Sequence, residues 1–154
     1  MENISEHISY SEAIYSPTAI EKKISNEPND EQLDSMKAVA TNIFERVRAH
    51  FGKPIRINSF FRSGALNKAV GGAITSQHCK GEAIDVTGLP YGTKNSEIFH
   101  YIKDNLDFDQ LIWEFGDSKE PLWVHFSYNL RGNKRKCLRS VKDHNGKTIY
   151  QNFV

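Results

Sequence analysis

The sequence predicts an α+β fold in which helices pack on one face of a small, mostly antiparallel sheet. Helical patterns dominate the first half of the chain and strand patterns the second half, an order typical of α+β folds. With 154 residues the chain has the length of one domain and can bury about two-thirds of its unfolded surface. We therefore expect residues 1–154 to fold as a single domain.

Two helical patterns precede the first strand pattern. Over residues 31–51, apolar side chains recur at three- and four-residue steps, and Asp30 is available as the cap. A shorter helix is predicted to begin at Pro17, with Ser16 as its cap and residues 26–28 as its end. The longer helix therefore has an apolar face that a sheet can cover.

Two further helical patterns lie between strand patterns. Ser63 can cap a helix that runs to about Val70, where a glycine pair interrupts it. Residues 95–106 have helical spacing, with Asn95 or Ser96 as the cap.

Six runs have the alternation or the β-rich composition of strands. They cover residues 55–61, 83–88, 108–115, 122–129, 136–141 and 147–153. An Asn-Gly pair at 145–146 separates the last two runs and predicts a β-hairpin.

Charge and hydropathy exclude several classes of function. The net charge of +1 gives no general argument for binding nucleic acid or membranes, and no stretch approaches the ~18 apolar residues of a membrane span. The polar, acidic N-terminus lacks the pattern of a secretory signal, so we expect a protein that is cytoplasmic as synthesised. In that compartment Cys79 and Cys137 are expected to be reduced thiols.

The basic run at residues 131–136 has two interpretations. It is either a solvated turn or a patch for an anionic polymer. The turn is favoured because the run lacks interleaved aromatic residues and the chain lacks an overall basic charge. We expect no nucleic-acid partner.

Three side chains have the chemistry and the setting of metal ligands. His78 and Asp85 flank Gly81, a residue that lets the chain turn back between them. Asp85 and His125 each alternate with apolar neighbours in a strand run, so they should point away from the core. If the two strands are neighbours, the three side chains converge. Such a set can hold zinc and leave a fourth position for water.

The segment around these residues resembles a known family, the zinc D-alanyl-D-alanine carboxypeptidases. The family's motif Ser-x-His-x-x-Gly-x-Ala-x-Asp is met by Ser76, His78, Gly81, Ala83 and Asp85. Relatives include vancomycin-resistance D,D-dipeptidases, phage L-alanyl-D-glutamate endolysins and, more distantly, the hedgehog domain. The resemblance covers about residues 16–128 and continues through "FDQLIWEFG" and "WVHFSY".

The resemblance implies a fold, a metal and a base. It implies a hedgehog/D,D-peptidase-like fold and one Zn²⁺ per chain, with His78, Asp85 and His125 as the ligands. It also implies that Glu114 is the general base, because a carboxylate beside zinc can take a proton from water. Glu120 is the competing candidate, but it precedes a proline in a polar loop, which favours a solvated position.

The resemblance further implies residues that contact the substrate. Arg62 would bind a free carboxylate or a carbonyl of the peptide, since guanidinium presents a rigid fork of donors. A salt bridge with an acidic neighbour is the alternative for this arginine. Ser76 either donates to the substrate or caps the turn before His78, and Gln77 is expected to line the same mouth.

Trp123 departs from part of the family. D,D-carboxypeptidases often have a histidine two positions before the last ligand, where it helps stabilise the developing oxyanion. Tryptophan offers only an indole N–H and a flat surface, so Trp123 is expected to line the substrate site. Stabilisation of the oxyanion would then depend on zinc and Arg62, and specificity for a terminal D-alanine is not implied.

We therefore expect a zinc metallopeptidase that hydrolyses peptide bonds of bacterial peptidoglycan, as a D,D-carboxypeptidase or an L-Ala-D-Glu-type endopeptidase. The expected partners are peptidoglycan stem peptides, and the expected state is a monomer. The expected absence of a secretory signal suggests an endolysin-like, phage- or prophage-related enzyme that degrades the cell wall after release or within a phage particle. The alternative is a catalytically silent, zinc-stabilised module that binds the cell wall.

Overall fold

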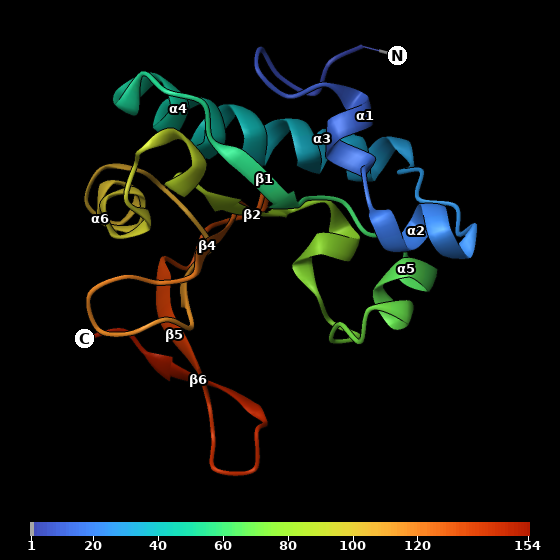
Figure 1. The fold of residues 1–154 in the computed structure, drawn as a ribbon. Coiled ribbons are helices and arrows are strands. Elements are labelled where there is room, and N and C mark those ends of the chain that lie inside the picture. Colours follow the sequence, from blue (N-terminus) through green and yellow to red (C-terminus); the bar gives the residue numbers. More distant parts are fainter. Residues whose placement is uncertain (1) are drawn as a thin grey trace.

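The computed structural model describes residues 2–154 and contains an open, six-stranded sheet with the strand order β1-β2-β4-β3-β5-β6 (Figure 1). The strands are β1 (Arg56–Ser59), β2 (Ala83–Thr87), β3 (Gln110–Glu114), β4 (Trp123–Ser127), β5 (Lys136–Lys142) and β6 (Thr148–Asn152). Strands β3 and β5 pair in parallel, and the other neighbours are antiparallel. The predicted α+β class is confirmed.

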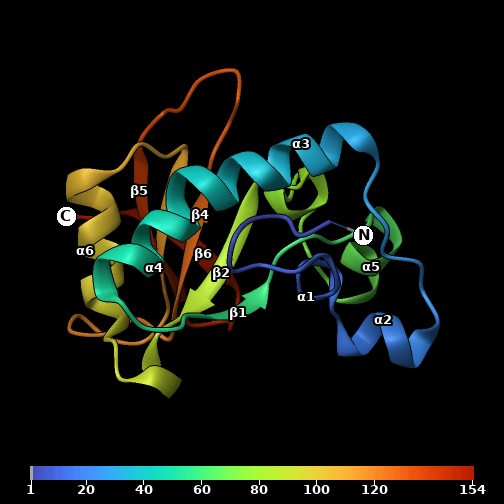
Figure 2. The same cartoon turned by 90° about the horizontal axis from the view of Figure 1, so that it is seen from above.

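Helices cover one face of this sheet. The α-helices are α1 (Tyr10–Ile14), α2 (Pro17–Lys22), α3 (Asp30–Val39), α4 (Glu45–Phe51), α5 (Gly64–Ala69) and α6 (Asn95–Asn105). Short segments η1 (Ala40–Phe44), η2 (Gln77–Lys80) and η3 (Leu89–Tyr91) complete the helical structure. Helices α3 and α4 cross the sheet as one long rod, with α6 beside them (Figure 2).

The long helix is present as predicted, but its cap is not Asp30. A π-helical turn, η1, joins α3 to α4, so the helical run is continuous from residue 30 to residue 51. Asn29 is the cap: its side chain accepts from the backbone N–H of Gln32 at 2.8 Å, and the Gln32 side chain accepts from the backbone N–H of Asn29 at 2.8 Å. Asp30 is instead the first helical residue, where its charge favours the helix dipole.

The predicted cap of α6 is also wrong. Helix α6 begins at Asn95 itself, and no side chain occupies the capping role at Lys94. The Asn95 side chain is buried and accepts from the backbone N–H of Gly88 at 2.9 Å. The backbone N–H of Ser96 donates to Glu120 at 3.2 Å, so a carboxylate from a distant loop does the work of a cap.

The other helix ends agree more closely with the sequence. Ser16 and Ser63 cap α2 and α5 as predicted, each accepting from a backbone N–H in the first helical turn. Helix α2 ends earlier than residues 26–28, because Lys23 adopts a left-handed conformation. No helix of residues 2–154 is long and apolar enough to cross a membrane.

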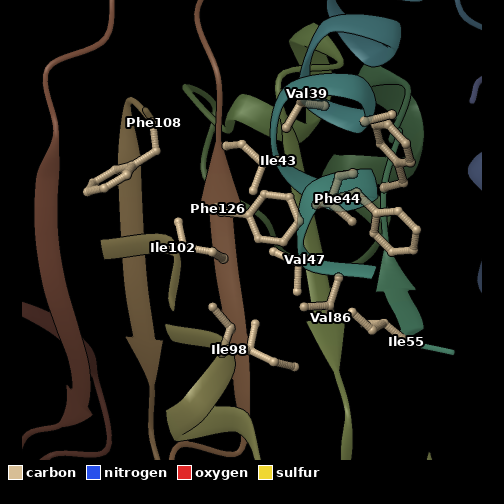
Figure 3. Close-up of a cluster of buried hydrophobic side chains, with 14 of the residues drawn as sticks. Val39, Ile43, Phe44, Val47, Ile55, Val86, Ile98, Ile102, Phe108 and Phe126 are labelled. Carbon is tan, nitrogen blue, oxygen red and sulfur yellow. The ribbon is translucent and has the colours of Figure 1, made fainter. Parts of the chain in front are cut away.

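The core lies between the long helix, α6 and the sheet. Val86 of β2 and Phe126 of β4 pack into it against apolar side chains of the helices (Figure 3). Ile84 of β2 belongs to the same buried cluster. Neighbouring side chains along a strand point to opposite faces. Asp85 and His125 therefore point away from the helices, onto the face of the sheet that carries the polar site.

Candidate metal centre

The register of β2 and β4 brings Asp85 and His125 together. The two residues are direct partners in this antiparallel pair, and such partners share a face with their Cβ atoms about 5 Å apart. The Asp85 Oδ1 atom lies 2.8 Å from Nδ1 of His125. Two strand positions distant in sequence thus become adjacent candidate ligands through ordinary sheet pairing.

His78 reaches the same carboxylate from the η2 turn. Gly81 ends this turn with φ 73°, and a Cβ there would lie 2.6 Å from the backbone oxygen of Gln32. Only glycine fits both requirements, so the chain can double back into β2 here. The Nε2 atom of His78 lies 3.2 Å from Asp85 Oδ2.

The protonation of the His78 ring follows from its other nitrogen. Nδ1 of His78 lies 2.7 Å from the backbone oxygen of Phe60, and a carbonyl can only accept, so Nδ1 carries the hydrogen. Nε2 faces the Asp85 carboxylate: without an ion a proton between the two groups holds this contact, and a bound metal would replace that proton. Burial alone would raise the pKa of Asp85, but the charge of the neighbouring His78 and the hydrogen bond with His125 outweigh it and hold this pKa well below its usual range.

These three residues fit a zinc ion. Their donor atoms lie within 4.8 Å of one another, and the two ligand-to-ligand distances to Asp85 are 2.8 and 3.2 Å. Zinc bonds of about 2.1 Å in a tetrahedron require ligand atoms roughly 3.4 Å apart, close to what the residues already provide. Two imidazoles and one carboxylate are also a donor set that catalytic zinc sites use.

A polar chain supports His125 from behind. Its Nε2 atom lies 3.2 Å from Oε1 of Gln77, and the Gln77 amide nitrogen donates to Oδ2 of Asp109 at 3.1 Å. Asp109 is buried, and its Oδ1 accepts from the backbone N–H of Lys134 at 2.9 Å. Because Asp109 only accepts, it turns the amide so that the oxygen faces His125, which leaves Nδ1 of that ring for a metal. Sequence reasoning gave Gln77 a different role and missed Asp109, which no motif marks.

Glu114 ends β3 on the same face of the sheet. It is the direct partner of Trp123 in β4 and lies one step diagonally from His125. The side chain is buried, and its Oε2 accepts from the Ser140 hydroxyl at 2.5 Å. Burial raises the pKa of Glu114 more than the Ser140 hydrogen bond lowers it. A buried carboxylate with a raised pKa beside a candidate metal site has the properties of a proton carrier.

Glu120, the competing carboxylate, forms its hydrogen bond with another element. Glu120 accepts from the first turn of α6, at the backbone N–H of Ser96. The loop that carries it is held tightly, since a Cβ at Gly116 would lie 2.1 Å from the Glu120 backbone oxygen. Glu120 thus has a structural task, which favours Glu114 as the base.

Arg62 lies beside the cluster without an acidic partner. Its backbone N–H donates to the His78 carbonyl at 3.2 Å, and Nη2 lies 3.4 Å from the Ser76 hydroxyl. Among residues 2–154, no acidic side chain forms a salt bridge with Arg62, and its buried Nε lacks a hydrogen-bond partner. A structural salt bridge, the alternative role for Arg62, is therefore not formed among the described residues. Ser76 accepts from the backbone N–H of His78 at 3.3 Å, the capping arrangement that the sequence left open.

Trp123 forms a half-buried aromatic wall on the Glu114 side. Its ring packs 5.5 Å, centroid to centroid, from that of Phe115. The two cysteines lie outside the cluster as free thiols. Within the basic run, Arg135 donates to the carbonyls of Leu106 and Lys103 at the end of α6 and covers Phe108, so at least this residue is structural.

The fold and the site together define a class: an α+β protein whose open sheet face carries a His-Asp-His cluster and a buried glutamate, as in a metallohydrolase. The model of the family described as Peptidase M15 matches residues 6–127, and the chain belongs to this peptidase family. The resemblance inferred from the motif is thus confirmed. No curated protein matches the chain. The matched span contains every site residue predicted from the sequence and ends with β4.

Proposed function

We propose that this chain is a zinc-dependent peptidase that hydrolyses peptide bonds in peptidoglycan stem peptides. The observation that carries the proposal is the convergence of His78, Asp85 and His125 next to the buried carboxylate of Glu114. Membership of the peptidase M15 family supports the class of reaction.

The three ligands would hold one Zn²⁺ through Nε2 of His78, a carboxylate oxygen of Asp85 and Nδ1 of His125. When bound, zinc polarises the scissile carbonyl and makes water more acidic. The Asp85 carboxylate balances part of the ion's charge, and the two imidazoles bind as neutral rings. The hydrogen bonds to Phe60 and Gln77 hold these rings in the orientation that binding requires.

Glu114 moves the proton. Ser140 occupies its Oε2 atom, so Oε1 is the oxygen available to the attacking water. Oε1 accepts a proton as the water oxygen bonds to the scissile carbon, and it delivers this proton to the leaving amine as the C–N bond breaks. The raised pKa of Glu114 suits both steps, because a carboxyl that holds its proton more firmly is a better base.

Arg62 would orient the peptide. Its fork of donors suits the free carboxylate or a carbonyl of the bound peptide. Ser76, Gln77 and Trp123 would line the mouth around it. Replacing Arg62 by alanine should reduce turnover while zinc remains bound, because the residue contacts no ligand side chain.

Two cleavage specificities remain within this proposal: D,D-carboxypeptidase and L-Ala-D-Glu-type endopeptidase. Trp123 in place of a histidine weighs against strict terminal D-alanine specificity. We place the enzyme in a phage or prophage setting, as an endolysin-like, monomeric, single-domain protein that degrades the cell wall.

The test is digestion of purified peptidoglycan with zinc-loaded and chelator-treated protein, followed by mass spectrometry of the released fragments. The expected result is zinc-dependent release of new amines, and the fragment masses identify the bond. Glu114→Gln should lower kcat by about 10²-fold or more while zinc stays bound. Wild-type activity in Glu114→Gln would mean that the assigned base is wrong.

A second candidate is a zinc-stabilised module that binds the wall without turnover. The one feature that favours it is Trp123, which offers a flat binding surface where many relatives have a catalytic histidine. Stoichiometric zinc and tight wall binding without released amines would support this candidate instead.

A further inference from the structure

We propose that the β5–β6 hairpin is a working part of this active site, although it lies beyond the residues that the family model matches. Ser140 of β5 is a positioning residue for Glu114, and Tyr150 of β6 contacts the bound peptide. The inference rests on the proposed function, because it assigns partners to the base and the substrate of that reaction.

The register of the sheet places these residues in one row. Glu114 pairs with Trp123 on one side and with Ser140 on the other, and Ser140 pairs with Tyr150. Direct partners on adjacent strands point to the same face. Four strands therefore present this row on the face that carries His125, and β5 and β6 continue the sheet beyond β3 (Figure 1).

The hydrogen bonds of Ser140 fix the direction of its hydroxyl. The Ser140 Oγ accepts from the backbone N–H of Phe115 at 3.2 Å, so its own hydrogen is free to point elsewhere. It lies 2.5 Å from Glu114 Oε2, and an ionised carboxylate can only accept. The hydroxyl therefore donates to Glu114. Both side chains are buried, so water cannot easily replace this bond.

This bond determines which oxygen of Glu114 does chemistry. With Oε2 engaged, the carboxylate cannot rotate freely, and Oε1 has no hydrogen-bond partner among residues 2–154. A base held in one orientation loses less freedom on reaching the transition state. The bond also favours the ionised form, the form that must accept the first proton.

Tyr150 extends the site toward solvent. Its side chain is 57% exposed and stands at the end of the row that begins with Trp123. Burial of the hydroxyl raises the pKa of Tyr150, and the charges of Glu114 and Asp85 raise it further, which places the phenol within the field of the site. A neutral phenol is a hydrogen-bond donor that suits a peptide carbonyl or carboxylate.

The role of Ser140 is tested with Ser140→Ala in the zinc-free and the zinc-loaded protein. In the zinc-free protein, the pKa of Glu114, followed by NMR, should rise because a hydrogen bond to the ionised form is lost. In the loaded enzyme, kcat should fall roughly tenfold or more, and the acid limb of the kcat/KM profile should move to higher pH. Zinc affinity should not change. An unchanged Glu114 pKa together with an unchanged pH profile would overturn the positioning role.

The role of Tyr150 is tested with Tyr150→Phe. Because the Tyr150 side chain is exposed, this substitution should not disturb folding. The KM for stem peptides should rise roughly three- to tenfold, the value of one hydrogen bond, with a smaller change in kcat. Gln151→Ala is the matched control, because Gln151 is exposed on the neighbouring position of β6 and pairs with Arg139, outside the row. Equal KM values for Tyr150→Phe and Gln151→Ala would remove Tyr150 from the site.

These outcomes separate the two proposals. If the wild-type protein cleaves no peptide, the proposed function fails, and the Glu114 pKa in zinc-free Ser140→Ala still decides the positioning contact. If the wild type is active and both hairpin variants behave like it, the proposed function stands and the role of the hairpin fails.

Discussion

At the scale of single residues, both histidines of the cluster use one nitrogen for support and direct the other toward Asp85. Nδ1 of His78 donates to the Phe60 carbonyl, and Nε2 of His125 faces the Gln77 amide oxygen. The other nitrogens, Nε2 of His78 and Nδ1 of His125, lie 3.2 and 2.8 Å from the Asp85 carboxylate. The supports thus hold each ring in the orientation that an ion would require, which lowers the cost of binding one.

The support of His125 can be tested through zinc retention. Gln77→Ala removes the acceptor for Nε2–H, and Asp109→Asn sets an amide donor against the donor of Gln77. Each change should weaken zinc binding by about tenfold or more, as measured by competition with a chromophoric chelator. Gln151→Ala should bind zinc like the wild type. Unchanged affinity in both variants would show that the ring needs no support from this side.

Glu114 should cost the zinc-free protein stability. The pKa of Glu114 in the folded protein is raised above that of an ordinary carboxyl group. The contribution of Glu114 to stability is therefore largest at low pH, where it is protonated in the folded and the unfolded state, and this contribution is lost as pH rises through the folded pKa. Glu114→Gln removes the charge but keeps an acceptor for Ser140. The variant should therefore be more stable than the wild type in urea unfolding at pH 7, and the gain should vanish near pH 4. A gain of equal size at both pH values would contradict the linkage.

At the scale of elements, the start of α3 tests how a helix cap is identified from sequence. Asn29 and Gln32 form a reciprocal capping box, whereas Asp30 is already helical. Asn29→Ala should lower the free energy of unfolding by about 1 kcal/mol, and Asp30→Ala should cost less because it removes only a favourable charge. Chemical denaturation of the two variants measures this directly. A larger loss for Asp30→Ala would contradict the assignment.

The elements were predictable where the signal is local. Alternation in β2 and β4 correctly directed Asp85 and His125 away from the core, and the Asn-Gly pair correctly marked the β5–β6 hairpin. Caps were less predictable, because several neighbouring residues could each accept the same backbone N–H. The Glu120 contact with α6 spans 24 residues, and no local pattern could reveal it.

The residues of the candidate site also differ in how far the sequence alone could reveal them. His78, Asp85 and His125 follow from a motif and from alternation, so the sequence was enough to identify them as candidates. Ser140 could not be found, because its contact with Glu114 depends on the parallel pairing of β3 with β5, two strands that β4 separates in the sequence. Strand order of this kind is a property of the whole sheet, and it is absent from the sequence of either strand.

At the scale of the whole molecule, α3 and α4 cross one face of the sheet (Figure 2), and the candidate metal cluster lies on the opposite face. The apolar residues of β2 and β4 pack against α3, α4 and α6, while the alternate residues include Asp85 and His125 of the candidate metal site. Two of the proposed ligands, Asp85 and His125, therefore lie on paired strands, whereas the third, His78, belongs to the η2 turn outside the sheet. A bound ion would tie that turn to β2 and β4.

Zinc should consequently stabilise the entire fold. An ion that binds only the native state adds RT ln(1 + [Zn]/Kd), about 4 kcal/mol at 1,000 times Kd, which raises Tm by roughly 8–16 °C in a chain of this size. Removing zinc with a chelator should lower Tm by that amount in differential scanning calorimetry, and Asp85→Ala, which lacks one ligand, should show little response. The response should also weaken as the pH is lowered, because protons compete with zinc for the ligand atoms. Equal melting temperatures with and without chelator at pH 7.5, at saturating zinc, would mean that the cluster does not hold the ion.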